Sequence, residues 1–172
     1  MGLSGYDLKV KESKDSQMVF EFKSEGTKGS IHKLIRFSES SISGIFYFEF
    51  GDKIEGADEI DITSVSNNGD RKKIYATLRS SIYAFTEKNM EAWVFLTGNT
   101  KAKTRLLRME ATLCYYNLKQ DFVILGLRNG EWEDFQTDVD YLAIIMKRKG
   151  NLPQQPDSAF LPLIFKRYVV YD

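Results

Sequence analysis

The spacing of the apolar residues changes along this chain, and this change limits most strongly which folds the chain can adopt. Residues 18–22, 31–37 and 45–50 alternate β-branched or aromatic side chains with polar ones, which is typical of strands. Residues 71–88 and 101–117 instead repeat apolar side chains every three or four positions, which predicts two helices. We therefore expect an antiparallel strand meander that is followed by helices.

Short apolar runs between and after the helices predict further strands, at 60–65, 93–96, 122–125 and 141–146. The pair Asn129-Gly130 predicts a tight hairpin turn. We expect an α+β fold, in which a mixed, largely antiparallel sheet contains a β-α-β-α-β segment and carries two main helices. The second helix would pack on the sheet through its apolar stripe, formed by Ala102, Leu106, Met109, Leu113 and Tyr116.

The length of 172 residues fits one domain. We expect residues 1–149 to form a single α+β domain. Residues 150–172 begin as a linker with Pro153 and Pro156 and end in an apolar tail. Such a tail should not stay in water, so it packs either on the domain or on a partner chain, and the second outcome gives a homo-oligomer.

The second helix begins with an unusual charge pattern. Helix N-termini carry partial positive charge, so acids are favoured in the first turn. Here the first acid is Glu110, and it follows four cations: Lys101, Lys103, Arg105 and Arg108. This inversion suggests a nearby anion.

Two loops could form one site. If the strands at 60–65 and 93–96 are joined through the first helix as a parallel β-α-β unit, the loops after them meet at the carboxyl edge of the sheet, where ligands bind. Asn68 and Thr100 are also ordinary N-cap residues, and Gly98 also suits a left-handed turn. The candidate ligand-binding residues are Asn67, Asn68, Asp70, Lys73, Gly98, Asn99, Thr100, Lys101, Arg105 and Arg108.

The charges form two blocks in a chain of net charge zero. Residues 49–70 hold seven acids against one base, a net charge of −6, and residues 71–108 hold nine bases against two acids, a net charge of +7. The blocks either face each other, with Arg105 and Arg108 paired to acids at 52–61, or leave a basic surface for a ligand. The sequence leaves both possibilities open.

Residues for catalysis are sparse. The single histidine, His32, is far in sequence from the single cysteine, Cys114, which we expect to be a buried small residue of the second helix. We expect no cofactor. Several acids could bind Mg²⁺ for phosphodiester cleavage, with Lys73 stabilising charge. These acids are Asp52, Asp58, Asp61 and Asp70.

Several short strings of the chain resemble a known family. They are Phe50-Gly-Asp52, Asn67-Asn-Gly-Asp70, Lys73, Ala76-Thr77 and the run from Gly98 to Leu107. Over roughly residues 18–149 the chain resembles an uncharacterised family of small bacterial proteins, known only as a domain of unknown function. The resemblance implies a bacterial cytoplasmic protein and brings no activity, cofactor or catalytic residue.

Location and function can be predicted only broadly. No apolar run approaches the ~20 residues that span a bilayer, and the N-terminus lacks the pattern of a secretory signal. With one cysteine, we expect a cytoplasmic protein without membrane association. Our leading hypothesis is binding of a phosphate-bearing ligand, nucleic acid or nucleotide, at the edge formed by 66–70 and 98–108. The alternatives are a protein-interaction or self-assembly module and a metal-dependent nuclease, so whether the chain is an enzyme stays open.

Overall fold

A computed structural model describes residues 4–150, which fall into two compact units. Unit 1 comprises residues 4–39 and 47–88, and unit 2 comprises residues 40–46 and 89–150. No helix of the described residues is long and apolar enough to cross a membrane.

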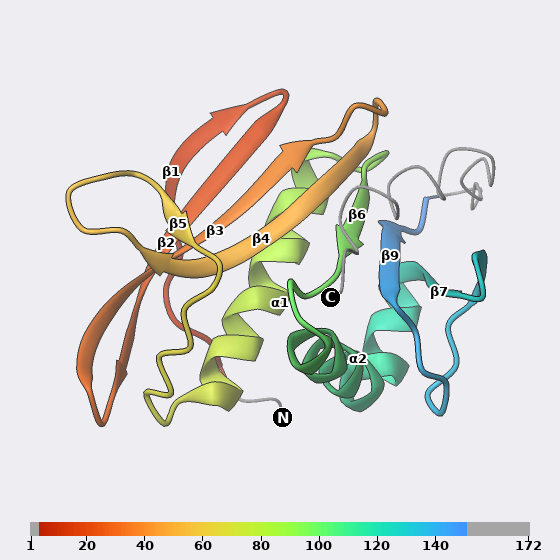
Figure 1. Cartoon of the computed structure of the whole chain (residues 1–172). Coiled ribbons are helices and arrows are strands. Elements are labelled where there is room, and N and C mark those ends of the chain that lie inside the picture. Colours follow the sequence, from red (N-terminus) through yellow and green to blue (C-terminus); the bar gives the residue numbers. More distant parts are fainter. Residues whose placement is uncertain (1–3, 151–172) are drawn as a thin grey trace. The chain divides into compact units, whose positions relative to one another are not determined.

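Unit 1 is a curved antiparallel sheet with one helix (Figure 1). Its elements are β1 (Lys9–Lys14), β2 (Gln17–Gly26), β3 (Gly29–Glu39), most of β4 (Ile45–Lys53), β5 (Ile60–Asp61) and α1 (Arg71–Lys88). The strands are ordered β1-β2-β3-β4, and the short β5 pairs with β4 in antiparallel orientation. Strands β2 and β3 pair over ten positions, from Gln17 with Ser38 to Gly26 with Gly29.

One face of this sheet packs against α1. Phe37 of β3 is fully buried, and its ring stacks on Phe85 of α1 with 4.3 Å between the ring centres. Leu78 and Ile82, on the same side of the helix, are also buried. The apolar spacing of residues 71–88 therefore predicted the correct inward face of this helix.

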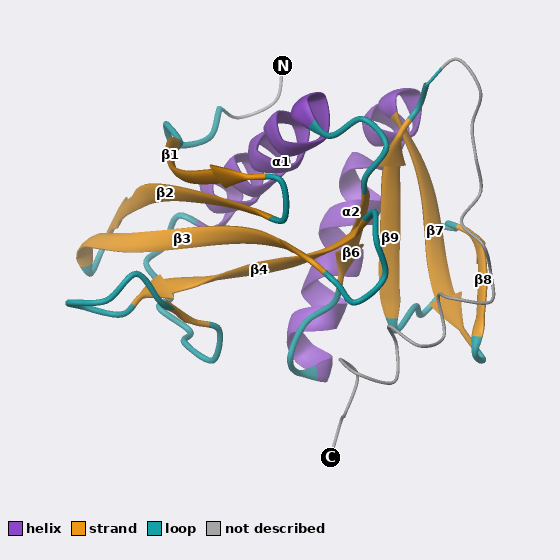
Figure 2. Cartoon of the chain, turned by 90° about the horizontal axis from the view of Figure 1, so that it is seen from above, coloured by secondary structure: helices purple, strands orange, loops and turns teal. Residues whose placement is uncertain are grey.

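Unit 2 contains a second antiparallel set of strands and α2 (Figure 2). Its elements are β6 (Trp93–Leu96), α2 (Lys101–Asp121), β7 (Phe122–Arg128), β8 (Glu131–Asp134) and β9 (Ala143–Arg148), beside the first residues of β4. The strand order is β6-β9-β7-β8. The predicted hairpin turn is confirmed, because Asn129 and Gly130 join β7 to β8 with φ angles of 53° and 76°.

The predicted fold class is confirmed. The described chain has two helices and a largely antiparallel sheet, and its middle runs β5-α1-β6-α2-β7. The main differences from the expectation are that β5 has only two residues, that β1 was not expected, and that α2 ends at Asp121 rather than Asn117. The apolar tail predicted at 160–171 lies outside the described residues, so its packing stays a prediction.

The predicted inward stripe of α2 is wrong. Met109, Leu113 and Tyr116 are 43%, 76% and 69% exposed. The residues of α2 that are buried are instead Thr104 and Leu118. The helix therefore packs in unit 2 through the opposite side and turns its apolar stripe outward.

Candidate functional site

Asn68 anchors the loop before α1 to the β2–β3 hairpin. The side chain is 2% exposed. Its Nδ2 donates to Ser24 Oγ at 3.0 Å and to the carbonyl oxygen of Gly29 at 2.9 Å, and its Oδ1 accepts from the Lys28 amide at 2.7 Å. Gly26 allows this approach, because a Cβ there would lie 1.8 Å from the Asn68 carbonyl oxygen. The polar groups of Asn68 are thus used within the fold. The predicted role of Asn68 as an N-cap is wrong, because its Oδ1 accepts from the β2–β3 turn and not from the first turn of α1, which begins at Arg71.

Asp70 holds the segment before β1 against the start of α1. Its Oδ2 accepts from Tyr6 Oη at 2.6 Å and from Ser24 Oγ at 2.5 Å. The other oxygen, Oδ1, is buried without a hydrogen-bond partner among the described residues. Burial, followed by the hydrogen bond to Asp70, raises the pKa of the Tyr6 hydroxyl above its ordinary value. Lys73 lies over the Tyr6 ring, with 4.3 Å from Nζ to the ring centre.

Asn67 has no comparable anchoring. Its side chain is exposed, and its backbone adopts a positive φ of 46°. Asparagine tolerates this left-handed conformation better than most residues. Asn67, Asn68, Asp70 and Lys73 all belong to unit 1, and the remaining candidate residues belong to unit 2.

The loop after β6 is built to start α2. The Gly98 amide donates to Thr104 Oγ1 at 3.1 Å, and a Cβ on Gly98 would lie 2.5 Å from the Thr104 nitrogen. Only glycine therefore fits between the strand end and the helix. Thr100 is the N-cap, as predicted, because its side chain accepts from the Lys103 amide at 3.2 Å. Asn99 is exposed.

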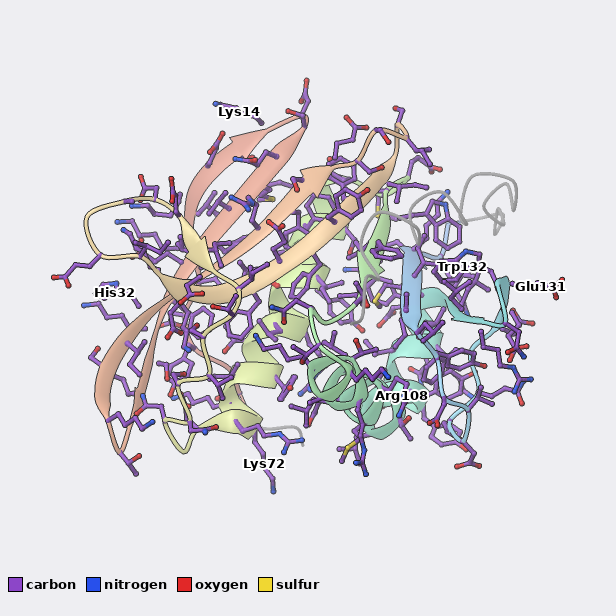
Figure 3. All side chains as sticks on the ribbon, viewed as in Figure 1. Lys14, His32, Lys72, Arg108, Glu131 and Trp132 are labelled. Carbon is purple, nitrogen blue, oxygen red and sulfur yellow. The ribbon has the colours of Figure 1, made fainter. Side chains whose placement is uncertain are left out.

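The cations of α2 differ in their surroundings. Lys101 and Arg105 are exposed, and neither has an ion-pair partner within the described residues of unit 2. Arg108, labelled in Figure 3, pairs with Asp140 at 3.0 Å. The Asp140 side chain is 92% exposed, so solvent screens this pair strongly.

Acids of the 49–70 block have basic partners on the strands of unit 1. Arg36 of β3 donates through Nε to Glu49 at 2.8 Å. The three pairs are Arg36 with Glu49, Lys33 with Asp52 and Lys53 with Asp58. Lys33 is 3% exposed and also donates to Ser66 Oγ at 2.6 Å. These pairs give the acids a structural role within unit 1.

Metal-binding and nucleophilic groups are dispersed in the described residues. No group of three or more His, Cys, Asp or Glu side chains is close enough to hold a metal ion in the range 4–150. Asp61 Oδ1 instead accepts from its own turn, from the Thr63 amide at 2.9 Å. His32 Nδ1 lies 3.0 Å from Glu21 Oε1 on β2. Cys114 is half-buried in α2.

The outward face of α2 is the surface that the sequence prediction missed. We define the α2 seam as Ala102, Leu106, Met109, Leu113 and Tyr116. Its members follow one another at alternating intervals of four and three residues. That spacing is the pattern of a helix that packs along another helix. It was present in the sequence but was assigned to the core of the domain.

Residues 3–149 match the sequence model of a family of unknown function, DUF6934. The chain belongs to this family. The predicted resemblance to an uncharacterised domain family is thereby confirmed. The DUF6934 match includes both candidate loops and all of α2, and the family description gives no ligand or activity. No curated protein and no solved structure matches the chain.

Proposed function

We propose that this domain is a protein-interaction module that binds its partner through the α2 seam. The observation that carries the proposal is the exposure of Leu113 and Tyr116, at 76% and 69%, on the outward side of a long helix. Burying one such side chain fully is worth ~1.5–3 kcal/mol. Several such side chains on one exposed face lower the solubility of the domain, so an exposed apolar face of this kind marks a site that a partner covers.

The other large apolar side chains that unit 2 exposes do not form a comparable surface. Among the described residues of this unit, only Met90 is strongly exposed outside α2, at 45%, and it lies in the loop before β6. Single exposed apolar residues are common on protein surfaces and need no explanation. Three on one side of one helix therefore mark that side as a binding face.

Cysteine labelling tests whether the seam is covered in cells. Leu113→Cys in a Cys114→Ser background places one thiol on the seam, and Lys72→Cys in the same background is the control, on an exposed position of α1. N-ethylmaleimide should modify the seam cysteine more slowly in the cells that naturally make the protein than in dilute purified protein. The control cysteine should react equally in both.

Two results would remove the proposal. Equal rates for the seam cysteine in cells and in dilute solution would show that nothing covers the seam. Slow labelling even in dilute monomeric protein would show that the chain covers its own seam.

A second candidate function is binding of a phosphate-bearing ligand at the start of α2. The favouring observation is that Lys101 and Arg105 are exposed, without an ion-pair partner among the described residues of unit 2, beside the positive end of the helix dipole. Asn68 and Asp70, two of the other candidate residues, make hydrogen bonds within unit 1.

Salt dependence of nucleic-acid binding tests this candidate. If Lys101 contacts a phosphate, Lys101→Glu should weaken binding to single-stranded RNA and flatten the slope of log affinity against log salt by roughly 0.7 for the lost contact. Lys72→Glu, at an exposed position in unit 1, is the matched control. No binding by the wild-type chain at low salt, or equal slopes for both variants, would exclude the contact.

A further inference from the structure

The α2 seam has the geometry of a coiled-coil face. When the helix is written in heptads, the seam residues fall on alternating d and a positions, beginning with Ala102 at d and ending with Tyr116 at d. At 100° per residue, the f positions lie about 180° from the seam. They are Thr104, Ala111 and Leu118, and the first and last of these are buried in unit 2. Helix α2 therefore packs in its own unit through f. Its a and d positions face solvent, with Leu106 half-buried and the other four seam residues exposed.

Charged residues flank the seam in a pattern that specifies a partner. Arg105 and Lys119 occupy g positions, whereas Lys103 and Glu110 occupy e positions. In a parallel pair of identical helices, each g residue faces the e residue five positions further along the other helix. Arg105 would then face Glu110 of the partner subunit, and two-fold symmetry would give this pair twice.

An antiparallel pair has the opposite electrostatics. In the register that places a positions against d positions, e residues face e residues and g residues face g residues. Glu110 would face Glu110 of the partner subunit. Arg105 would face Lys119 of the partner subunit, again twice by symmetry. Like charges held opposite each other disfavour that arrangement.

We infer that the partner of the α2 seam is a second copy of this chain, with the two α2 helices parallel and in register. This inference rests on the proposed interaction function and names its partner. Glu110 also has a contact within its own chain, and a carboxylate can accept several hydrogen bonds, so the two contacts are compatible. The seam side chains would meet their own counterparts: Leu113 against Leu113 of the partner subunit, and likewise along the row.

The oligomeric state of the purified full chain is the first test. Light scattering should give a mass of twice 19.8 kDa, in a concentration-dependent equilibrium with monomer. Leu113→Glu should give monomer at every concentration with an unchanged circular dichroism spectrum. Val65→Glu is the matched control, because Val65 is 66% exposed and lies in unit 1, and it should remain a dimer. A monomeric wild type would overturn the inference. If the seam cysteine were still labelled more slowly in cells, the interaction function would stand, and the partner would be a different protein.

Disulfide trapping tests the orientation. In a Cys114→Ser background, Ala102→Cys should form a disulfide-linked dimer under mild oxidation, since parallel helices bring the two copies of position 102 together. The competing arrangement predicts no such link, and instead a link between Ala102→Cys and Gln120→Cys chains when the two are mixed. That result would overturn the parallel orientation while leaving self-association in place.

Charge exchange tests the paired residues. Arg105→Glu and Glu110→Arg should each weaken the dimer by roughly tenfold, because each replaces two attractive pairs with two repulsive ones. The double variant should restore it. Equal weakening in the double variant would exclude the Arg105–Glu110 pairing.

Discussion

Replacing Asn68 tests whether a single buried side chain fastens the loop before α1 to the β2–β3 hairpin. Asn68→Ala removes three hydrogen bonds of 2.7–3.0 Å, to the amide of Lys28, the carbonyl oxygen of Gly29 and the hydroxyl of Ser24. A typical net value is ~0.5–1.5 kcal/mol for each bond. The hairpin turn is exposed, so water replaces part of what is lost. We expect the free energy of unfolding to fall by about 2–3 kcal/mol.

Urea denaturation followed by far-ultraviolet circular dichroism measures this loss. The matched control is Asn99→Ala, which removes the same amide group from an exposed position and should change stability by less than about 0.5 kcal/mol. Amide hydrogen exchange of residues 26–30 should rise in the Asn68 variant alone. If both variants had the same urea midpoint and the same amide exchange rates at residues 26–30, Asn68 would not hold the loop to the hairpin.

Three further predictions follow from contacts in the two units. Gly98→Ala should lower stability by about 2 kcal/mol or more through overpacking at the start of α2, whereas Gly150→Ala, in open space, should not; thermal denaturation compares them. The pKa of Tyr6 is raised, first by burial, so the unfolded chain releases this proton at a lower pH than the folded chain. The resulting stabilisation is full below the ordinary pKa near 10 and is lost as the pH rises through the higher pKa of the folded state. An ultraviolet titration of the wild type, compared with Tyr6→Phe, detects the raised pKa. Asp52→Ala should cost about 3 kcal/mol, because it leaves the buried Lys33 without its ion-pair partner, and Asp52→Ala with Lys33→Met should recover part of that loss in the same urea assay.

The prediction from the sequence was correct for elements whose apolar residues all lie in the core. Leu78, Ile82 and Phe85 lie on one side of α1, and the core of unit 1 covers that side, so the spacing identified both the helix and its inward face. Strand β1 was missed because its sequence, Lys-Val-Lys-Glu-Ser-Lys, is polar except for Val10 and is almost entirely exposed. An edge strand of this kind forms through backbone pairing with β2, which leaves no apolar period to detect.

The candidate site was harder to predict because its contacts join distant parts of the chain. Thr100 was correctly predicted as an N-cap, since its partner is only three residues away. The partners of Asn68 are about 40 residues earlier, and no local pattern connects them. The seam of α2 was detected as apolar, but spacing alone does not say whether a face packs inward or outward. The direction depends on which side of α2 packs against the strands of unit 2, and that side is the one with Thr104 and Leu118.

The division of β4 between the two units has a consequence for synthesis and for gene dissection. Residues 40–46 belong to unit 2, although they are made before half of unit 1. A ribosome that has translated 88 residues has therefore delivered all of unit 1 but only that short piece of unit 2. Ile45 and Phe46, each 5% exposed in the folded chain, can be buried in unit 2 only after residues 89 onward have been synthesised. Any single cut in the gene leaves at least one unit without part of its own sequence.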